Sequence, residues 1–462
     1  MSVAEPTSTT ARLEKVIGVE HLFTDAGRLG EYAIDAIAPK TVARPENAVQ
    51  TAEIVRTAVE EKWGVIPCGA RSAIGVGAPP TDFDVALDMT RLTGIASYDP
   101  ADLTISVNAG MRLSDLAQAL TEKRQFLPLE VPFFERATVG GAIAAGLDSP
   151  LRQFYGAPRD FLIGAEFVDG TGAQAKSGGR VVKNVTGYDF HKLLNGSLGT
   201  LAVITRLNFR TYPVPVARRG FLASFTDDLG ALRFAKEIAG SALTPIVVEI
   251  LSPESAGLLF AQYAPFASLC AAQGKQEWTV CVGFEGSGDV CERYARELAR
   301  MAREAAAQNA MAMHDEPFAA LLEILREAPA TMRDVASDAV VLRFAALPSQ
   351  LADLLRAVRS FAGSSWMRAP VLVRSGSVVY MALLPRTGDE TALKQVEYFW
   401  KSVGSLRGKL EFRGSLVFCP ARWKAALNVW AHVDVNVEME RRVKKAFDPN
   451  AVFARGRFVG GM

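Results

Sequence analysis

Three segments of this chain have the glycine-rich composition with which loops hold phosphate groups. The first follows a short apolar strand and runs from Val65 to Pro79, with glycines at 69, 75 and 77. The second is Ala137–Gly146, and the third runs from Lys183 to Thr205, with glycines at 187, 196 and 199. Small residues let the backbone approach another surface and leave N–H groups free to bind a pyrophosphate. One such loop could be an ordinary turn, but three of them favour contact with a ligand.

Read in order, these segments resemble the FAD-binding domain of the vanillyl-alcohol oxidase type, also called the p-cresol methylhydroxylase type. The likeness runs from about residue 38 to 215 and resumes at 444–457. Within the family, the chain most resembles the FAD-binding subunit of bacterial glycolate oxidases. That likeness rests on the glycine pair at 140–141, the Arg-Asp pair at 159–160 and the Lys-Asn-x-x-Gly-Tyr-Asp run at 183–189. The family's Asn-Pro-Gly-Arg ending reads Ala-Arg-Gly-Arg at 454–457.

The resemblance implies a set of FAD-binding residues, each of which could instead be a turn or surface residue. The backbone amides of the first segment would bind the diphosphate: Pro67, Cys68, Gly69, Ala70, Arg71 and Ser72. Three residues would pass close to the ribityl chain or the diphosphate: Thr138, Gly140 and Gly141. Three would line the flavin edge: Lys183, Asn184 and Tyr188. Four would lie near the adenine or the ring: Ser197, Leu198, Gly199 and Val203.

The types and spacing of cysteine and histidine argue against a metal site and against a covalent flavin. The four histidines lack i, i+4 or H-x-H spacing, and the five cysteines form no C-x-x-C pair. The His-x-Gly-Asp-Gly-Asn segment that many flavin-dependent 2-hydroxy-acid dehydrogenases carry is absent. Because the loop from Cys68 to Ser72 has no histidine, we expect non-covalent FAD, with Cys68 as the residue to check. The sequence identifies no catalytic base, although His191, within the third segment, is the histidine nearest to the proposed flavin loop.

Composition limits the classes of partner and location. The formal net charge is +1, and no basic stripe stands out, so nucleic-acid binding is disfavoured. No G-x-G-x-x-G or P-loop signature is present, which leaves flavin as the nucleotide cofactor. Residues 1–10 are polar, and no apolar run approaches the roughly 18 residues of a membrane span. We therefore expect a cytoplasmic protein that a partner could attach to the inner membrane.

Periodicity predicts an α+β fold with an antiparallel sheet in the second half of the chain. The resemblance implies that this fold is a two-lobed FAD-binding domain of the vanillyl-alcohol oxidase type with an antiparallel-sheet cap domain. Apolar residues at 48, 52, 55 and 59 predict a helix, which is followed by strands at 65–67, 84–89, 103–109 and 164–168, with a further helix at 113–123. Seven cap strands are expected at 220–225, 246–251, 279–284, 339–345, 371–374, 378–384 and 410–418, with helices near 229–239, 288–306, 349–361 and 390–403. The predicted divisions are an N-terminal extension (1–37), the FAD-binding domain (38–215), the cap (216–430) and a segment returning to the FAD domain (431–462).

The resemblance implies a flavoprotein subunit of a 2-hydroxy-acid oxidase or dehydrogenase complex of the glycolate type. A catalytic flavoprotein subunit and an iron–sulfur subunit would be its partners, glycolate or D-lactate the substrate, and its own flavin would relay electrons. Two alternatives stay open. The chain could be a self-standing FAD-dependent dehydrogenase, or a non-catalytic scaffold with a flavin fold.

Overall fold

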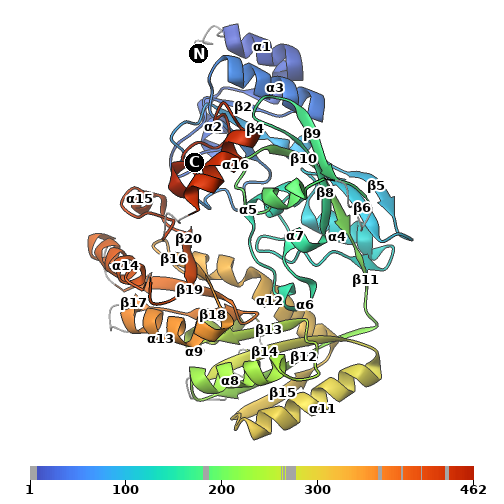
Figure 1. The fold of residues 1–462 in the computed structure, drawn as a ribbon, viewed down its shortest axis with the longest axis vertical. Helices are drawn as coiled ribbons and strands as arrows, with labels where there is room; N and C mark the ends of the chain where they lie inside the picture. Colours follow the sequence, from blue (N-terminus) through green and yellow to red (C-terminus); the bar gives the residue numbers. More distant parts are fainter. Residues whose placement is uncertain are drawn as a thin grey trace.

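Two lobes, each built on its own β-sheets, make up the molecule in Figure 1. This computed structural model describes residues 8–180, 187–261, 263, 266, 277–362, 367–386, 389–406, 408–431 and 436–462. The upper lobe contains the N-terminal part of the chain and the C-terminal helix, and the lower lobe contains the residues between them. None of the helices in the described part of the chain has the length and hydrophobicity that crossing a membrane requires.

The first sheet of the upper lobe places the first glycine-rich segment at the end of a parallel strand. Its strand order is β1-β2-β4-β3, and β4 runs parallel to both β2 and β3. Asn47 caps α3 by accepting a hydrogen bond from the Gln50 amide, and the apolar face of this helix packs on the sheet. The elements are α1 (Ser8–Ile17), β1 (Leu22–Phe23), α2 (Ala26–Glu31), β2 (Thr41–Ala43), α3 (Ala48–Glu60), β3 (Val65–Cys68) and β4 (Val85–Asp88).

The second sheet of the upper lobe is antiparallel, with the order β5-β6-β10-β8-β9. Helices α4 and α5 pack on it through a core that includes Leu116, Val139 and Phe209. Its elements are β5 (Ile95–Asp99), β6 (Thr104–Asn108), α4 (Leu113–Thr121), α5 (Val139–Ala145), α6 (Arg152–Tyr155), α7 (Pro158–Phe161), β8 (Leu162–Val168), β9 (Gln174–Gly178), the 3-10 helix η3 (Phe190–Leu194) and β10 (Val203–Arg210). The short pair β7 (Gln125–Phe126) and β11 (Tyr212–Pro213) lies where the chain leaves this lobe.

The lower lobe is a nine-stranded antiparallel sheet that follows the order β15-β12-β14-β13-β18-β19-β16-β20, with β17 paired to β19. We call it the cap. Its strands are β12 (Ala217–Phe225), β13 (Val247–Leu251), β14 (Trp278–Gly286), β15 (Asn309–Met313), β16 (Val340–Ala346), β17 (Met367–Arg368), β18 (Val371–Arg374), β19 (Val378–Pro385) and β20 (Phe412–Phe418). Its helices are α8 (Asp228–Ala239), α9 (Pro253–Phe260), α11 (Gly288–Glu304), α12 (Asp315–Asp334), α13 (Leu351–Ala362), α14 (Asp389–Gly404) and α15 (Ala421–Lys424).

Side chains alternate between the two faces of the cap sheet, as the period of two in a strand requires. In β19, Val379 and Met381 pack in a core with the helices α8, α11, α13 and α14, which we call the outer helices. Tyr380, between them, packs with residues of the upper lobe. The same alternation turns Glu249 and Arg343 toward the upper lobe, because their strand neighbours face the outer helices. The face of the cap that meets the upper lobe therefore carries charged side chains within apolar strands.

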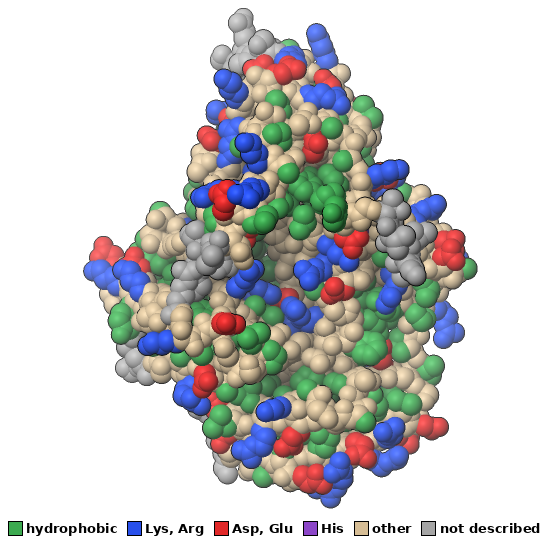
Figure 2. Space-filling model, in the orientation of Figure 1, with side chains coloured by type: hydrophobic (Ala, Val, Ile, Leu, Met, Phe, Trp, Pro, Cys, Tyr) green, Lys and Arg blue, Asp and Glu red, His purple; other side chains and the backbone are tan. Residues whose placement is uncertain are grey.

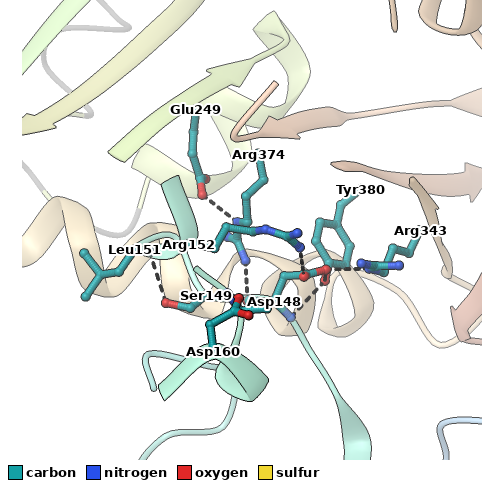
Figure 3. Close-up of polar contacts among 10 residues, drawn as sticks. Asp148, Ser149, Leu151, Arg152, Asp160, Glu249, Arg343, Arg374 and Tyr380 are labelled. Carbon is teal, nitrogen blue, oxygen red and sulfur yellow. Dashed lines mark hydrogen bonds and ion pairs between the residues drawn. The ribbon is translucent and has the colours of Figure 1, made fainter. Parts of the chain in front are cut away.

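One fully buried arginine joins the cap sheet to the upper lobe. Arg374, on β18, lies directly opposite Glu249 in the strand register, and its Nε donates to the Glu249 carboxylate (Figure 3). Its Nη1 donates to the carbonyl oxygen of Asp148 at 2.6 Å, and its Nη2 to that of Leu325 at 2.6 Å. These three acceptors belong to a cap strand, to the α5–α6 loop of the upper lobe and to α12, so one side chain connects all three.

Helix α12 also docks on the upper lobe through charged groups. The Glu327 carboxylate accepts hydrogen bonds from the amides of Phe133 (2.7 Å) and Phe134 (3.2 Å). The preceding residue, Arg326, adds an ion pair of 3.0 Å with Glu130. The cap is thereby held against the loop that leads into the second glycine-rich segment.

The C-terminal segment returns to the upper lobe and completes its first sheet. After α16 (Val437–Phe447), the Val65 amide donates to the Val452 carbonyl at 2.8 Å, and the Ala454 amide donates to the Val65 carbonyl at 2.9 Å. Lys444 adds hydrogen bonds to the carbonyl oxygens of Thr200 and Phe453. The strand before the first glycine-rich segment is thus fixed by residues that follow the whole cap.

The structure confirms the predicted α+β class and the antiparallel cap sheet. All seven predicted cap strands lie in that sheet, and the four predicted cap helices correspond to α8, α11, α13 and α14. Sequence reasoning missed the edge strand β15, the short strand β17 and the helices α9, α12 and α15. Strand β15 is mostly exposed and reads Asn-Ala-Met-Ala-Met. It therefore has none of the β-branched residues that indicate a strand. Helix α12 contains Pro329, a residue type that argues against a helix interior.

We expect Arg374→Met to lower the free energy of unfolding by about 3–5 kcal/mol, because it leaves the carboxylate of Glu249 buried without its cation. Urea denaturation followed by circular dichroism measures the loss. The double variant Arg374→Met/Glu249→Leu should regain most of it. Arg356→Met is the matched control, because that side chain is 70% exposed on α13. Equal stability of Arg374→Met and Arg356→Met would contradict the joining role of Arg374.

Candidate functional site

A cavity opens where the first and second glycine-rich segments face each other. Its lining includes these predicted residues: Pro67, Cys68, Gly69, Ala70, Arg71, Ser72, Thr138, Gly141 and Leu198. An adjoining cavity shares Gly69 and Thr138 with the first and adds Gly140 and Gly199. The structure therefore brings together predicted residues from all three glycine-rich segments.

The first two segments approach each other so closely that side chains are excluded at the contact. A Cβ on Gly69 would lie 1.9 Å from the Thr138 hydroxyl oxygen. A Cβ on Gly140 would lie 2.8 Å from the Cβ of Ala109. The Thr138 hydroxyl in turn accepts a hydrogen bond from the Gly141 amide at 3.2 Å and caps α5. Positions 69 and 140 therefore require glycine, because the backbone at each lies too close to Thr138 or Ala109 for a side chain.

A buried carboxylate holds the first segment in shape. Asp88, at the end of β4, accepts a hydrogen bond of 2.6 Å from the Tyr32 hydroxyl and lies 3.2 Å from Arg44 Nε. The guanidinium of Arg71 stacks 4.0 Å from the centre of the Tyr32 ring. Arg71 also has a left-handed backbone (φ 61°), so a non-glycine residue makes the sharp turn of this loop. Burial, followed by the hydrogen bond to Asp88, raises the pKa of Tyr32, which keeps its hydroxyl protonated.

Arg457 lines the same cavity, although sequence reasoning did not include it among the binding residues. Its side chain is buried, and its Nη2 donates to the carbonyl oxygens of Ile74 and Val76. Its Nε and Nη1 have no hydrogen-bond partner among the residues that the structure describes. Burial lowers the pKa of Arg457 to about 10, so the group remains charged at neutral pH. The available signal is the arginine that ends the family's Asn-Pro-Gly-Arg pattern, which this chain keeps at position 457.

A buried cation with unpaired donors indicates a ligand that carries negative charge or acceptor atoms. Apart from Arg71, the rest of the cavity that Arg457 lines is made of small or apolar side chains, with the hydroxyls of Ser72 and Thr138, and of backbone of the glycine-rich segments. Such a lining suits a large, flat or extended molecule with an anionic part. These observations fit a flavin nucleotide, which combines an apolar ring system with a diphosphate.

Several predicted residues lie away from this cavity. Tyr188 is 82% exposed and contacts the ring of Phe190, with centroids 5.8 Å apart. Val203 is buried in the core beneath α3. Ser197 is also buried, and its hydroxyl has no partner among the described residues. The remaining two, Lys183 and Asn184, lie outside the described residues.

His191, the histidine within the third segment, is part of the core. His191 is 2% exposed, and its Nδ1 lies 3.0 Å from the Ser177 hydroxyl oxygen. Burial lowers its pKa, and it is not among the residues that line the cavity. Cys68 does line the cavity, but burial raises the pKa of its thiol. Within the described residues, no group of three or more His, Cys, Asp or Glu side chains is placed to hold a metal ion.

Two family models match this chain, and together they cover both lobes. The model of the FAD binding domain matches residues 39–178, and the model of the C-terminal domain of FAD linked oxidases matches residues 214–373. The first match contains the first two glycine-rich segments. The second contains most of the strands of the cap sheet.

Two curated relatives are subunits of glycolate oxidase. GlcE of Escherichia coli is 35% identical over 197 residues, which cover 42% of this chain and 55% of GlcE. GlcD of Bacillus subtilis is 25% identical over 346 residues, which cover 73% of this chain and 72% of GlcD. The chain thus matches only about half the length of GlcE.

A solved structure of p-cresol methylhydroxylase with substrate bound has the same fold. Its TM-score is 0.74 at 14% identity, and the match covers 97% of this chain and 96% of that protein. The likeness extends over both lobes. The two family matches identify the chain as an FAD-linked oxidoreductase with FAD as its cofactor, and the likeness to p-cresol methylhydroxylase shows that its two lobes have the fold of that protein.

Proposed function

We propose that this chain is the FAD-binding subunit of a 2-hydroxy-acid oxidase or dehydrogenase complex of the glycolate type, in which its flavin relays electrons. The observation that carries the flavin part is the cavity in which Arg457 presents unpaired donors beside the glycine-rich segments. The complex is supported by the likeness to GlcE and GlcD, both of which are named as glycolate oxidase subunits. A catalytic flavoprotein subunit and an iron–sulfur subunit would be the partners.

Residues 38–215 and 431–462 would hold FAD, and residues 216–430 would cover it. The backbone of Pro67–Ser72 would bind the diphosphate, and Arg457 would offset the negative charge of the cofactor. Thr138 would fix the distance between the two loops. When bound, FAD accepts and passes on electrons through its isoalloxazine ring. The cap sheet and α12 would exclude water from it.

The relay role is supported by the chemical character of the cavity wall. The side chains that line it in the described part of the chain are small or apolar, apart from two arginines, two hydroxyls and the thiol of Cys68. General bases are most often histidine or carboxylate groups, which a catalytic partner subunit would supply. The self-standing dehydrogenase is the second candidate, because Arg152 and Arg343 both pair with Asp148, the residue after Leu147 of the cavity lining.

A substitution at Gly69 tests the proposed diphosphate site. Gly69→Val should lower the FAD content of the purified protein, since its side chain would collide with Thr138 and force the two loops apart. The ratio of flavin to protein absorbance measures the content. Gly75→Ala is the control, because a Cβ there meets nothing within 4 Å. Full occupancy in a folded Gly69→Val variant would place the diphosphate elsewhere.

A further prediction concerns attachment of the cofactor. Acid precipitation should release the flavin into the supernatant, because the loop offers no histidine and the thiol of Cys68 is held protonated by burial. Colour that stays in the pellet would show a covalent bond. Mass spectrometry of the peptide containing Cys68 would then tell whether its sulfur carries the flavin.

The relay itself is tested by anaerobic mixing with glycolate or D-lactate while flavin absorbance is followed. The purified chain alone should stay yellow on a turnover timescale, whereas the complex reconstituted with its partners should bleach. Rapid bleaching of the lone chain would reject the relay and favour the self-standing dehydrogenase. His191→Ala is the control. His191 is buried and does not line the cavity, so its loss should not change the rate of bleaching of the folded protein.

A further inference from the structure

Two buried cations hold the carbonyl groups of four successive residues in the first glycine-rich segment. Arg457 Nη2 donates to the carbonyl oxygens at positions 74 and 76, as described above. Lys424 Nζ donates to that of Gly75 and, at 3.1 Å, to that of Gly77. The two cations therefore bind alternate carbonyl groups, and together they fix the backbone of this part of the loop.

One of these cations comes from the cap. Lys424 is the last residue of α15, which follows the cap strand β20 (Figure 1). Its neighbour Trp423 is buried in the same core as the outer helices, whereas the side chain of Lys424 is only 1% exposed and points to the loop. Figure 2 shows a hollow between the two lobes. A cavity lined by both Gly75 and Phe418 places the loop opposite the end of β20.

The remaining donor of Lys424 binds a carboxylate that a tight turn of the upper lobe presents. Lys424 Nζ lies 2.9 Å from the carboxylate of Asp35. Asp35 and Ala36 have left-handed backbones (φ 51° and 67°), in a turn that two hydrogen bonds of 2.9 Å between residues 34 and 37 close. An ammonium group has three N–H donors, so this carboxylate and the two carbonyl groups use all of them.

The two cations differ in what they leave available. Lys424 has no donor left, but Nε and Nη1 of Arg457 have no partner among the residues that the structure describes. Burial lowers the pKa of Lys424, and the charge of Asp35 opposes this shift. The same carboxylate favours the charged form of Arg457. Two cations thus share one carboxylate, and among these three groups one positive charge is uncompensated.

Loss of Lys424 would leave two carbonyl groups close to the free donors of Arg457. Gly77 and Arg457 are neighbours, since a Cβ built on Gly77 would lie 3.8 Å from Arg457 Nη2. A buried carbonyl group without a donor costs free energy, so the loop gains by turning it to a donor that is free. The free nitrogens of Arg457 would then bind the loop and no longer face the cavity.

We propose that Lys424 is a positioning residue for the cofactor: by holding the carbonyl groups of Gly75 and Gly77, it keeps Nε and Nη1 of Arg457 free for the anionic part of the flavin nucleotide. This inference rests on the proposed placement of that nucleotide in the cavity. Lys424 is not among the residues that line the cavity or the adjoining one, so it acts through the loop and through Arg457. The cap thereby supports the cofactor site from behind its wall.

Titration of the apoprotein with FAD, followed by flavin fluorescence, tests this role in a double-mutant cycle. Lys424→Met and Arg457→Lys should each weaken FAD binding by about tenfold, because each removes charge-assisted hydrogen bonds to the ligand. Arg457→Lys keeps a cation for the carbonyl groups at 74 and 76 but lacks the further nitrogens of a guanidinium. Lys424→Met/Arg457→Lys should bind FAD no more weakly than Arg457→Lys alone, since the nitrogens through which Lys424 acts are already gone.

A merely structural role of Lys424 gives a different pattern. The two losses would then add, to about a hundredfold in the double variant, and this result would overturn the positioning role. Lys40→Met is the control and should bind FAD like the wild type, because that lysine is 80% exposed and pairs with Asp84. Should Lys424→Met fail to fold with Asp35 buried alone, Lys424→Met/Asp35→Asn removes both charges and enters the same cycle.

Arg457→Lys separates this inference from the proposed function. Wild-type affinity in Arg457→Lys would place the anionic part of FAD elsewhere, and would reject both the placement of the nucleotide and the positioning role. Weaker binding in Arg457→Lys together with wild-type affinity in Lys424→Met would reject the positioning role alone. The titration contains no 2-hydroxy acid, so its outcome does not depend on the electron relay.

Discussion

The arrangement of the two lobes depends on the buried guanidinium of Arg374. A charge of this kind is stable away from water only when its donors are fully paired. Its partners come from β13, from α12 and from the loop before α6, so satisfying the arginine requires that all three elements be in place. The position of the cap over the upper lobe follows from this requirement. So does the position of Asp148, whose carbonyl group is one of the acceptors.

The candidate cofactor site is made mainly of backbone and small side chains. Gly69 lets one loop touch Thr138, and Gly140 lets the following helix touch Ala109. Side-chain charge enters at Arg457, which arrives from the far end of the sequence. Recognition by backbone suits a diphosphate, because its oxygens accept hydrogen bonds from N–H groups whatever the side chains are. The apolar remainder of the wall suits the ring system of a flavin.

Local patterns predicted most elements and much of the cavity wall. The segment 67–72 could be recognised because a short apolar strand runs into successive small residues, and the cap strands because they are apolar and regularly spaced. Arg457 and Asp148 were not identified, because what distinguishes them is burial next to distant parts of the chain. A partial signal was present: Glu249 and Arg343 interrupt otherwise apolar strands, and a charge at such a position needs a partner that sequence alone does not name.

The pairing of β3 with residues 452–454 bears on how the protein is made. Strand β3 and the loop after it leave the ribosome early, but the residues that pair with Val65 are translated only after the entire cap. Until then the edge of this sheet has no partner, and long-range pairing of this kind is slow and open to aggregation. The candidate cofactor site is therefore complete only after the whole cap has been translated. A nascent chain stalled before the C-terminal segment would carry the loop but not the cation that faces its ligand.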